Sequence, residues 1–322
     1  MHTLQEYFSK WVPEIDRHLE REIRSLNTVV APLARHVVLS GGKRLRPILC
    51  MLTSKALGYK EEKALPLACA LELVHSATLL HDDVLDGAEL RRSKTAAHLQ
   101  FGTTQTILAG DALLALANKI VTSFENVSLI SCLSETIYQT ATGEILEIEK
   151  MKDTSLTQEE YLEIIIGKTG YLMQTCCQSS AILAGSSQEL ELAAQQFGLN
   201  LGIAFQLIDD AMDYTKTEDL TGKPLGGDLR EGKLTLPLIF FLQSLEQDVQ
   251  LEVLSKIKDK TLPQEEEDWI IGEINNRSFS QKTKQEAMYY LEKSSDALTL
   301  FPSYQAIGLL KQLLEFIKDR DN

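Results

Sequence analysis

Apolar residues recur at helical spacing along most of this chain. The pattern is clearest in four long stretches, at residues 64–86, 110–124, 188–213 and 305–319. Alternating patterns bounded by turn pairs, which are typical of strands, are scarce. Several stretches are apolar most of the way round, as in the central helices of a large bundle. The pattern predicts an all-α protein.

The chain shows no internal repeat, low-complexity tract or Gly/Ser-rich linker that would mark a domain boundary. Residues 247–281 are more polar than the rest and contain the acidic run Glu265 to Asp268, which predicts a solvated outer helix or loop. A chain of 322 residues is long enough to bury a substantial core. We therefore expect a single helical domain over residues 1–322.

The formal net charge of −14 limits the classes of partner. It argues against nucleic acid, because binding a phosphate backbone requires a basic face. A small polyphosphate ligand is still compatible with it, since such a ligand needs only local cations or metal ions held by carboxylates. The positions of the charged residues therefore matter more than their sum.

The N-terminal pattern and the cysteines both bear on the compartment in which the protein is expected. Residues 1–26 are amphipathic without the uninterrupted apolar core of a secretory signal, and no stretch reaches the 18 uncharged apolar residues of a membrane span. The cysteines form no CxxC pair, which predicts reduced, mostly buried thiols: Cys50, Cys69, Cys132, Cys176 and Cys177. We expect a cytoplasmic protein without a transmembrane segment.

Two aspartate clusters share the pattern D-D-x-x-D, and each ends an apolar helical stretch. The first contains Asp82, Asp83 and Asp86, and the second Asp209, Asp210 and Asp213. Positions i and i+4 lie one helical turn apart on the same face, so the outer aspartates of each cluster can reach one cation. Like charges at this spacing repel and lose solvation beside a buried surface, which favours a compensating cation. Ligands that are all oxygen point to Mg²⁺ or Mn²⁺, and Mg²⁺ commonly shares its coordination with substrate phosphates. Two solvated helix ends are the alternative.

Basic residues follow a pair of glycines in the string SGGKRLRPIL, just before a helical pattern begins. Glycines allow a close approach of the backbone to a ligand, and a helix N-terminus offers N–H donors to an anion. Lys43 and Arg46 share a face of this segment. A solvated basic turn is the alternative interpretation.

Further cations follow the first aspartate cluster. Arg91 and Arg92 come five to six residues after it, and arginine suits bidentate phosphate contacts. Lysines occur in three other short strings, at Lys168, Lys223 and Lys233. The string GKT at 167–169 is not a nucleotide-binding P-loop, because the glycine required five positions earlier is Leu162.

Taken together, these strings resemble the trans-isoprenyl diphosphate synthases, the polyprenyl synthetase family. The resemblance runs from Gly41 to the C-terminus and rests on the order and spacing of GGKRLRP, ELVHSATLLHDDVLD, LRR, GD at 110–111, KTGYL, AFQLIDDAMDY and TGKPLGGDLREGKLTLP. It implies a bundle of long helices around a deep cavity, usually as a homodimer. One departure is Ser93, where glycine commonly follows the arginine pair.

The resemblance also implies a reaction and a set of binding residues. An allylic diphosphate ionises with the help of about three Mg²⁺ ions, with Mn²⁺ as a possible substitute; isopentenyl diphosphate attacks the cation, and a proton is lost. The metal ions would be held by Asp82, Asp83, Asp86, Asp209, Asp210 and Asp213. Isopentenyl diphosphate would be bound by Lys43, Arg46, His75 and Arg92. The allylic diphosphate would be bound by Arg91, Lys168, Thr169, Gln206, Lys223 and Lys233, with Lys168 and Lys223 also counted as catalytic.

Residues before Asp82 on its helix bear on the length of the product. In this family, a bulky aromatic residue four or five positions before the first aspartate stops chain growth early, whereas this chain has Thr78 and Ala77 there. The next layer consists of Val74 and Leu73, and the helix from Ala70 to Asp82 spans about 18 Å. We expect a long product of about C30 to C50, with C20 or C15 as the alternative. Ala77 could also be small only because helices pack there.

Four alternatives differ from this function in what they require of the sequence. A terpene cyclase needs no isopentenyl diphosphate site and generally has one aspartate-rich motif. A non-catalytic partner subunit of a heteromeric synthase would show degraded metal motifs, and both are intact here. A catalytic subunit that needs such a partner stays open. A purely structural helical bundle would leave six clustered carboxylates unexplained.

Overall fold

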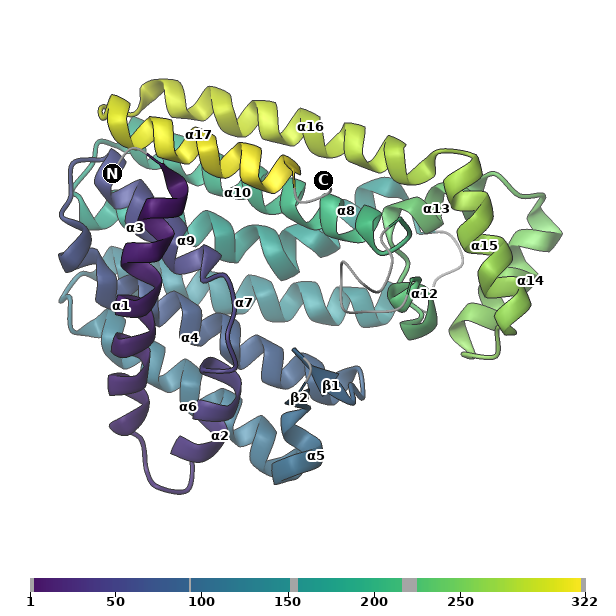
Figure 1. The fold of residues 1–322 in the computed structure, drawn as a ribbon, viewed down its shortest axis with the longest axis horizontal. Coiled ribbons are helices and arrows are strands. Elements are labelled where there is room, and N and C mark those ends of the chain that lie inside the picture. The colour runs from purple at the N-terminus through teal and green to yellow at the C-terminus, as the bar shows by residue number, and fades with distance from the viewer. Residues whose placement is uncertain (1–2, 93, 151–155, 216–224, 320–322) are drawn as a thin grey trace. The chain divides into compact units, whose positions relative to one another are not determined.

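The computed structural model describes residues 3–92, 94–150, 156–215 and 225–319, and almost all regular structure in them is helical (Figure 1). The all-α prediction is confirmed. The strands of the described residues form one short antiparallel hairpin, in which β1 (Leu90–Arg91) pairs with β2 (Lys94–Thr95). Lys223 and Ser93 lie outside the described residues.

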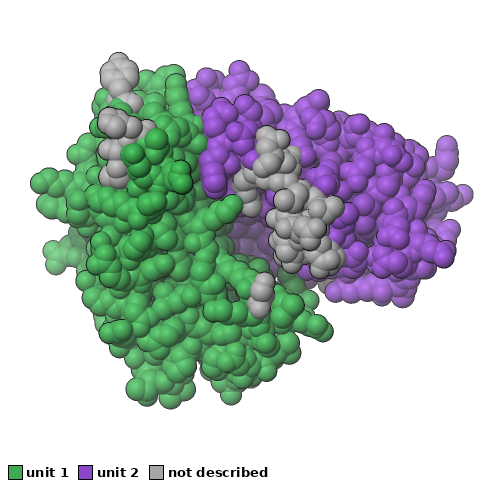
Figure 2. Space-filling view, in the orientation of Figure 1, with its two compact units in different colours: residues 1–137, 172–198, 297–313 green, residues 138–171, 199–296, 314–322 purple. Residues whose placement is uncertain are grey.

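The chain forms two compact units (Figure 2). Unit 1 consists of residues 1–137, 172–198 and 297–313, and unit 2 of residues 138–171, 199–296 and 314–322. Several boundaries fall inside helices, so neither unit is one continuous stretch of sequence. The single domain expected from the sequence stays a prediction.

The N-terminal helices all belong to unit 1. They are α1 (Leu4–Arg24), α2 (Ala31–Val38), α3 (Leu45–Ala56), α4 (Glu61–Leu85), α5 (Ala97–Phe101) and α6 (Thr103–Thr122). The first of them begins with a capping box: Thr3 accepts a hydrogen bond from the backbone N–H of Glu6, whose carboxylate accepts one from the Thr3 N–H.

Helix α4 is the central element of this unit and packs against α3 and α6 (Figure 1). It has buried residues on all its sides, consistent with the apolar pattern of the sequence. In the described part of the chain, it is the one helix whose length and composition would allow it to span a membrane. The sequence analysis did not anticipate this, but 67% of the apolar window is buried inside the protein, as in a core helix.

The rest of the chain adds the following helices: α7 (Val127–Lys150), α8 (Gln158–Ile165), η1 (Ile166–Gly170), α9 (Tyr171–Leu183), α10 (Gln188–Met212), α12 (Gly227–Glu231), α13 (Leu236–Gln243), α14 (Gln247–Lys258), α15 (Gln264–Asn276), α16 (Phe279–Ala297), η2 (Leu298–Leu300) and α17 (Tyr304–Lys318). The polar region forms α14, α15 and the start of α16. Glu265, Glu266 and Glu267 of its acidic run lie in the first turn of α15, where carboxylates interact favourably with the helix dipole.

Candidate active site

The first aspartate cluster ends helix α4 in unit 1. Asp83 is buried, and one of its carboxylate oxygens accepts hydrogen bonds from Nε (2.7 Å) and Nη2 of Arg91. Asp82 and Asp86 are only half-buried, and the N–H of Asp86 donates to the carbonyl of Asp82 across one turn. The middle aspartate therefore contacts Arg91 on a different side of the helix from the outer two, because each residue is rotated by about 100° from the one before it.

A group of basic side chains also lies in unit 1. A Cβ atom at Gly42 would lie 2.8 Å from Nη1 of Arg92, so the Arg92 guanidinium rests directly on the backbone of the glycine pair. Burial lowers the pKa of His75 well below its ordinary value, and the charges of Arg46 and Arg92 lower it further. The Nε of Arg46 is buried and has no hydrogen-bond partner among the described residues. The structure thus brings Arg46 and Arg92 close to His75. That these residues bind an anion stays a prediction.

Arg44 differs from its basic neighbours. It takes a left-handed conformation (φ 50°) just before α3, and its side chain is buried. Its guanidinium donates to Glu72 (3.0 Å), to Asp16 (2.7 Å) and to the carbonyl of Val38 (2.7 Å). These contacts make Arg44 a structural residue that joins three segments of unit 1.

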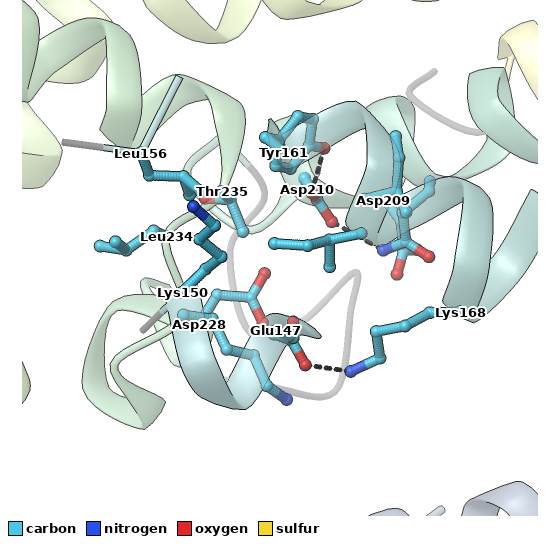
Figure 3. A pocket seen from close by; sticks show the side chains of 14 residues that line it. Glu147, Lys150, Leu156, Tyr161, Lys168, Asp209, Asp210, Asp228, Leu234 and Thr235 are labelled. Atoms are coloured by element: carbon cyan, nitrogen blue, oxygen red, sulfur yellow. Dashed lines mark hydrogen bonds and ion pairs between the residues drawn. The ribbon is translucent and has the colours of Figure 1, made fainter. Parts of the chain in front are cut away.

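The second cluster borders a pocket of about 190 Å³ in unit 2 (Figure 3). Its polar lining combines lysines and carboxylates: Lys150, Lys168, Lys233, Glu147, Asp209, Asp210 and Asp228. Leu156, Ile164 and Ile165 supply apolar lining. Five residues predicted from the sequence meet in this pocket, namely Lys168, Gln206, Asp209, Asp210 and Lys233.

A close approach of two backbones positions Lys168. It lies in the π-helical turn η1, and such turns are frequent at functional sites. A Cβ at Gly143 of α7 would lie 2.7 Å from Cα of Gly167, so only glycine permits this contact. The Lys168 ammonium lies 3.0 Å from a carboxylate oxygen of Glu144 and also pairs with Glu147. The predicted diphosphate-binding lysine is thus held by two carboxylates of α7.

Asp210 is the buried residue of the second cluster. Its carboxylate accepts hydrogen bonds from the Tyr161 hydroxyl (2.5 Å) and from Nε2 of Gln206 (2.7 Å). Burial raises the pKa of Asp210 to about 7, although both hydrogen bonds act in the opposite direction. Asp213 accepts a hydrogen bond from the backbone N–H of Asp228 (3.1 Å), and burial raises the pKa of the Asp228 carboxyl well above its usual range.

The residues expected to control product length lie in the interior of unit 1. Leu73, Val74 and Ala77 are fully buried, and Thr78 is half-buried with its hydroxyl donating to the carbonyl of His75 (2.9 Å). Such burial fits both a tunnel wall and ordinary helix packing. The length assignment to these positions stays a prediction.

Sequence reasoning missed several members of the pocket. Tyr161 lies seven residues before Lys168, two helical turns back, and this spacing was the available signal. Glu144 and Glu147 come one and four positions after Gly143, and Asp228 lies inside the string TGKPLGGDLREGKLTLP. Carboxylates that partner a lysine give no pattern of their own until the fold is known.

Comparison with known proteins identifies the family. The family model for polyprenyl synthetase matches residues 27–272. The chain belongs to the polyprenyl synthetase family. The octaprenyl diphosphate synthase of Escherichia coli is 36% identical over 74% of this chain and 74% of its own length. The geranyl-diphosphate-specific all-trans-nonaprenyl-diphosphate synthase of Rhodobacter capsulatus is 34% identical over 95% of this chain and 94% of its own.

A solved structure of the same family extends the comparison to the fold. The polyprenyl synthase of Caulobacter crescentus, complexed with calcium and isoprenyl diphosphate, is 33% identical and superposes with a TM-score of 0.90, covering 98% of both chains. The predicted family resemblance and the isoprenoid synthase fold are therefore confirmed. Members of the polyprenyl synthetase family are prenyltransferases, so the comparisons give this chain its enzyme class.

Proposed function

We propose that this chain is a Mg²⁺-dependent trans-prenyltransferase that condenses isopentenyl diphosphate with an allylic diphosphate to form an all-trans product of about C30 to C50. The observation that carries the proposal is family membership, because relatives named as octaprenyl and nonaprenyl synthases align along most of this chain. A product of C20 or C15 is the alternative that the assay below distinguishes.

The carboxylates of both clusters fit Mg²⁺ in their chemistry. Among the described residues, no three His, Cys, Asp or Glu side chains form a complete metal site. Mg²⁺ typically uses one or two carboxylates and completes its coordination with water and substrate phosphates. We propose as direct ligands the pairs one turn apart, Asp82 with Asp86 and Asp209 with Asp213. Asp83 and Asp210, which the sequence also suggested as ligands, act through the side chains that bind them. Bound Mg²⁺ supplies charge stabilisation for the diphosphate leaving group.

Basic side chains of unit 1 are the proposed site of isopentenyl diphosphate. Arg92 lies against Gly42, and the buried Nε of Arg46 has a hydrogen bond still to donate. His75 is neutral at pH 7 because of its lowered pKa, so it offers one N–H donor without adding a third full charge. Lys43 completes the proposed set.

The pocket of unit 2 is the proposed site of the allylic diphosphate. Lys168 and Lys233 line it, and Gln206 and Thr169 are joined by a hydrogen bond of 2.8 Å. Lys223 belongs to the same proposal from the sequence pattern. Arg91, which donates to Asp83 in unit 1, stays a prediction from the sequence. Cations here favour heterolysis of the allylic C–O bond, in which the bonding electron pair leaves with the diphosphate. The isopentenyl double bond then attacks the allylic cation, and loss of a proton completes the step.

A homodimer in the cytoplasm is part of the proposal. Tyr138, Ile145 and Ile148 lie on α7 at helical spacing and are 64%, 63% and 37% exposed, so a second copy would remove an apolar stripe from water. All five cysteines are free thiols, which suits a reducing compartment. Sedimentation of the purified chain tests the dimer.

The test uses the purified chain alone with Mg²⁺, farnesyl diphosphate and labelled isopentenyl diphosphate, and mass spectrometry of the products. We expect a ladder that ends at C30 or beyond and is abolished by a chelator. A ladder ending at C20 would replace the long-chain assignment with the shorter one. Absence of any product from a helical, metal-supplied sample would contradict the proposal for the isolated chain and indicate a required second subunit.

Asp82→Ala and Asp209→Ala test the two metal clusters separately. Each should lower turnover by orders of magnitude with little change in the circular dichroism spectrum, because both side chains lie at helix ends rather than in the core. Wild-type turnover in either helical variant would remove that cluster from the site.

A further inference from the structure

Four side chains form a continuous hydrogen-bonded chain in unit 2. The Tyr161 hydroxyl of α8 donates to Oδ2 of Asp210 (2.5 Å), and Nε2 of Gln206 donates to Oδ1 of the same carboxylate (2.7 Å). The Thr169 hydroxyl of η1 then donates to Oε1 of Gln206 (2.8 Å). Figure 3 shows Tyr161 above the Asp210 carboxylate, on the side away from Lys168. The chain thus joins three helices around one carboxylate.

The carboxylate sets the direction of every bond in this chain. The Tyr161 hydroxyl donates to one oxygen of Asp210 and Nε2 of Gln206 donates to the other, so both donors point to the carboxyl group. The Gln206 carbonyl consequently faces Thr169, whose hydroxyl proton is directed to it. A flipped amide would place its oxygen against the carboxylate and its nitrogen against Thr169, and both contacts would be lost.

This arrangement defines what each residue offers to a ligand. Both oxygens of Asp210 already accept a hydrogen bond, so each has one lone pair fewer to offer to a cation. Gln206 has one further amide proton, which is a donor suited to a phosphate oxygen. The orientation of the amide decides whether this donor or the carbonyl oxygen meets the ligand.

Tyr161 is the first residue of the hydrogen-bonded chain, and both it and Asp210 are buried, with 3% and 4% of their surfaces exposed. A buried hydrogen bond to a charged group contributes more than one between neutral groups, and leaving the carboxylate short of a donor is costly. The phenol therefore holds Asp210 in one orientation by donating to Oδ2, while Gln206 donates to the other oxygen, Oδ1.

We propose that Tyr161 is a positioning residue for prenyl transfer: through Asp210 it fixes the orientation of the Gln206 amide, and with it the Thr169 hydroxyl, in the site of the allylic diphosphate. The inference rests on the proposed function of this pocket. Tyr161 also lines this pocket, and the proposal assigns its hydroxyl to Asp210 rather than to the substrate.

Tyr161→Phe tests the proposal by removing one oxygen atom. The matched control is Tyr214→Phe, because Tyr214 is fully buried in the same unit and its hydroxyl lies 3.1 Å from Oγ1 of Thr235. For Tyr161→Phe we expect kcat/KM for farnesyl diphosphate to fall by about 10- to 100-fold, while the KM for isopentenyl diphosphate stays within about twofold. For Tyr214→Phe, both parameters should stay within about twofold of wild type.

A double variant separates positioning from a general structural effect. If Tyr161 acts through the amide, then adding Tyr161→Phe to Gln206→Ala should cost little beyond Gln206→Ala alone. The inference would be overturned if the losses of kcat/KM from Tyr161→Phe and Gln206→Ala multiplied in the double variant. It would also be overturned if the KM values of both substrates changed equally, or if Tyr161→Phe and Tyr214→Phe behaved alike.

An inactive wild-type protein would instead contradict the proposed function. The variants would then be compared by calorimetric binding of inorganic diphosphate with Mg²⁺. Weaker binding by Tyr161→Phe than by Tyr214→Phe would still support the positioning role, and equal binding would refute it.

Discussion

Replacement of Gly143 by alanine tests the backbone contact that positions Lys168. The added Cβ would lie 2.7 Å from Cα of Gly167 and 2.9 Å from N of Lys168, and these are backbone atoms that no side-chain rotation can move aside. Overpacking of this kind costs about 1–3 kcal/mol. Alanine in a helix interior recovers about 0.5–1 kcal/mol relative to glycine. The difference between these ranges is about 0–2.5 kcal/mol, and we expect Gly143→Ala to lower the free energy of unfolding by about 1 kcal/mol, near the middle of it.

Gly272→Ala is the matched control, since Gly272 lies inside α15 of the same unit and a Cβ there would meet nothing within 4 Å. It should be neutral or stabilising by about 0.5–1 kcal/mol, because only the helix propensity changes. Urea denaturation followed by circular dichroism measures both variants. Equal stability of the two would refute the reasoning, because it would mean that α7 and η1 separate without cost.

Three further predictions concern unit 1. Glu72→Ala should lower the free energy of unfolding by about 3 kcal/mol in urea denaturation, because it leaves the buried guanidinium of Arg44 without its buried partner. Gly42→Ala should raise the KM for isopentenyl diphosphate in steady-state assays, since its Cβ would displace Arg92. The lowered pKa of His75 means that, below pH 6.5, the unfolded chain binds a proton that the folded chain does not, so stability should fall as the pH decreases from about 6.5.

Each of these three has a control within the chain. Glu14→Ala removes only an exposed partner of Arg17 and should cost less than about 1 kcal/mol; a similar loss would contradict the buried-pair argument. Gly41 also has a positive φ, but a Cβ there would meet open space. Gly41→Ala should therefore raise the KM for isopentenyl diphosphate less than Gly42→Ala does. His75→Gln should flatten the pH dependence below 6.5, and an unchanged slope would assign it to other groups.

The helices and both aspartate clusters could be predicted because their signals are local. A hydrophobic period of 3.6 residues and a D-D-x-x-D spacing need only a few neighbouring positions. The same local geometry also distinguishes the outer aspartates from the middle one, since Asp83 and Asp210 point away from the face of their neighbours. What each middle carboxylate contacts could not be read from the sequence, because the Tyr161 partner of Asp210 lies 49 residues away.

Local backbone irregularities escaped prediction for a related reason. The turn that carries Lys168 is a π-helix, and a hydrogen-bond shift of one residue leaves the apolar pattern nearly unchanged. Gly143 and Gly167 are far apart in the sequence, and neither lies in a turn or has a positive φ that would mark it as a required glycine. Their role appears only when the two backbones are seen to touch.

Charge also has to be read locally. The chain carries a formal net charge of −14, yet the cations Arg46 and Arg92 lie close to the half-buried His75. Burial lowers the pKa of both arginines, while the Glu72 carboxylate acts in the opposite direction on each of them. Repulsion from Arg44, Arg91 and Arg46 lowers the pKa of Arg92 further, so burying these cations together destabilises the folded protein. A polar group left without a partner in a native structure calls for a reason, and the Nε of Arg46 is such a group. A bound anion would relieve the repulsion and accept the missing hydrogen bond at once. The unfavourable electrostatics of this group are thus physical support for an anion site, independent of the family comparison.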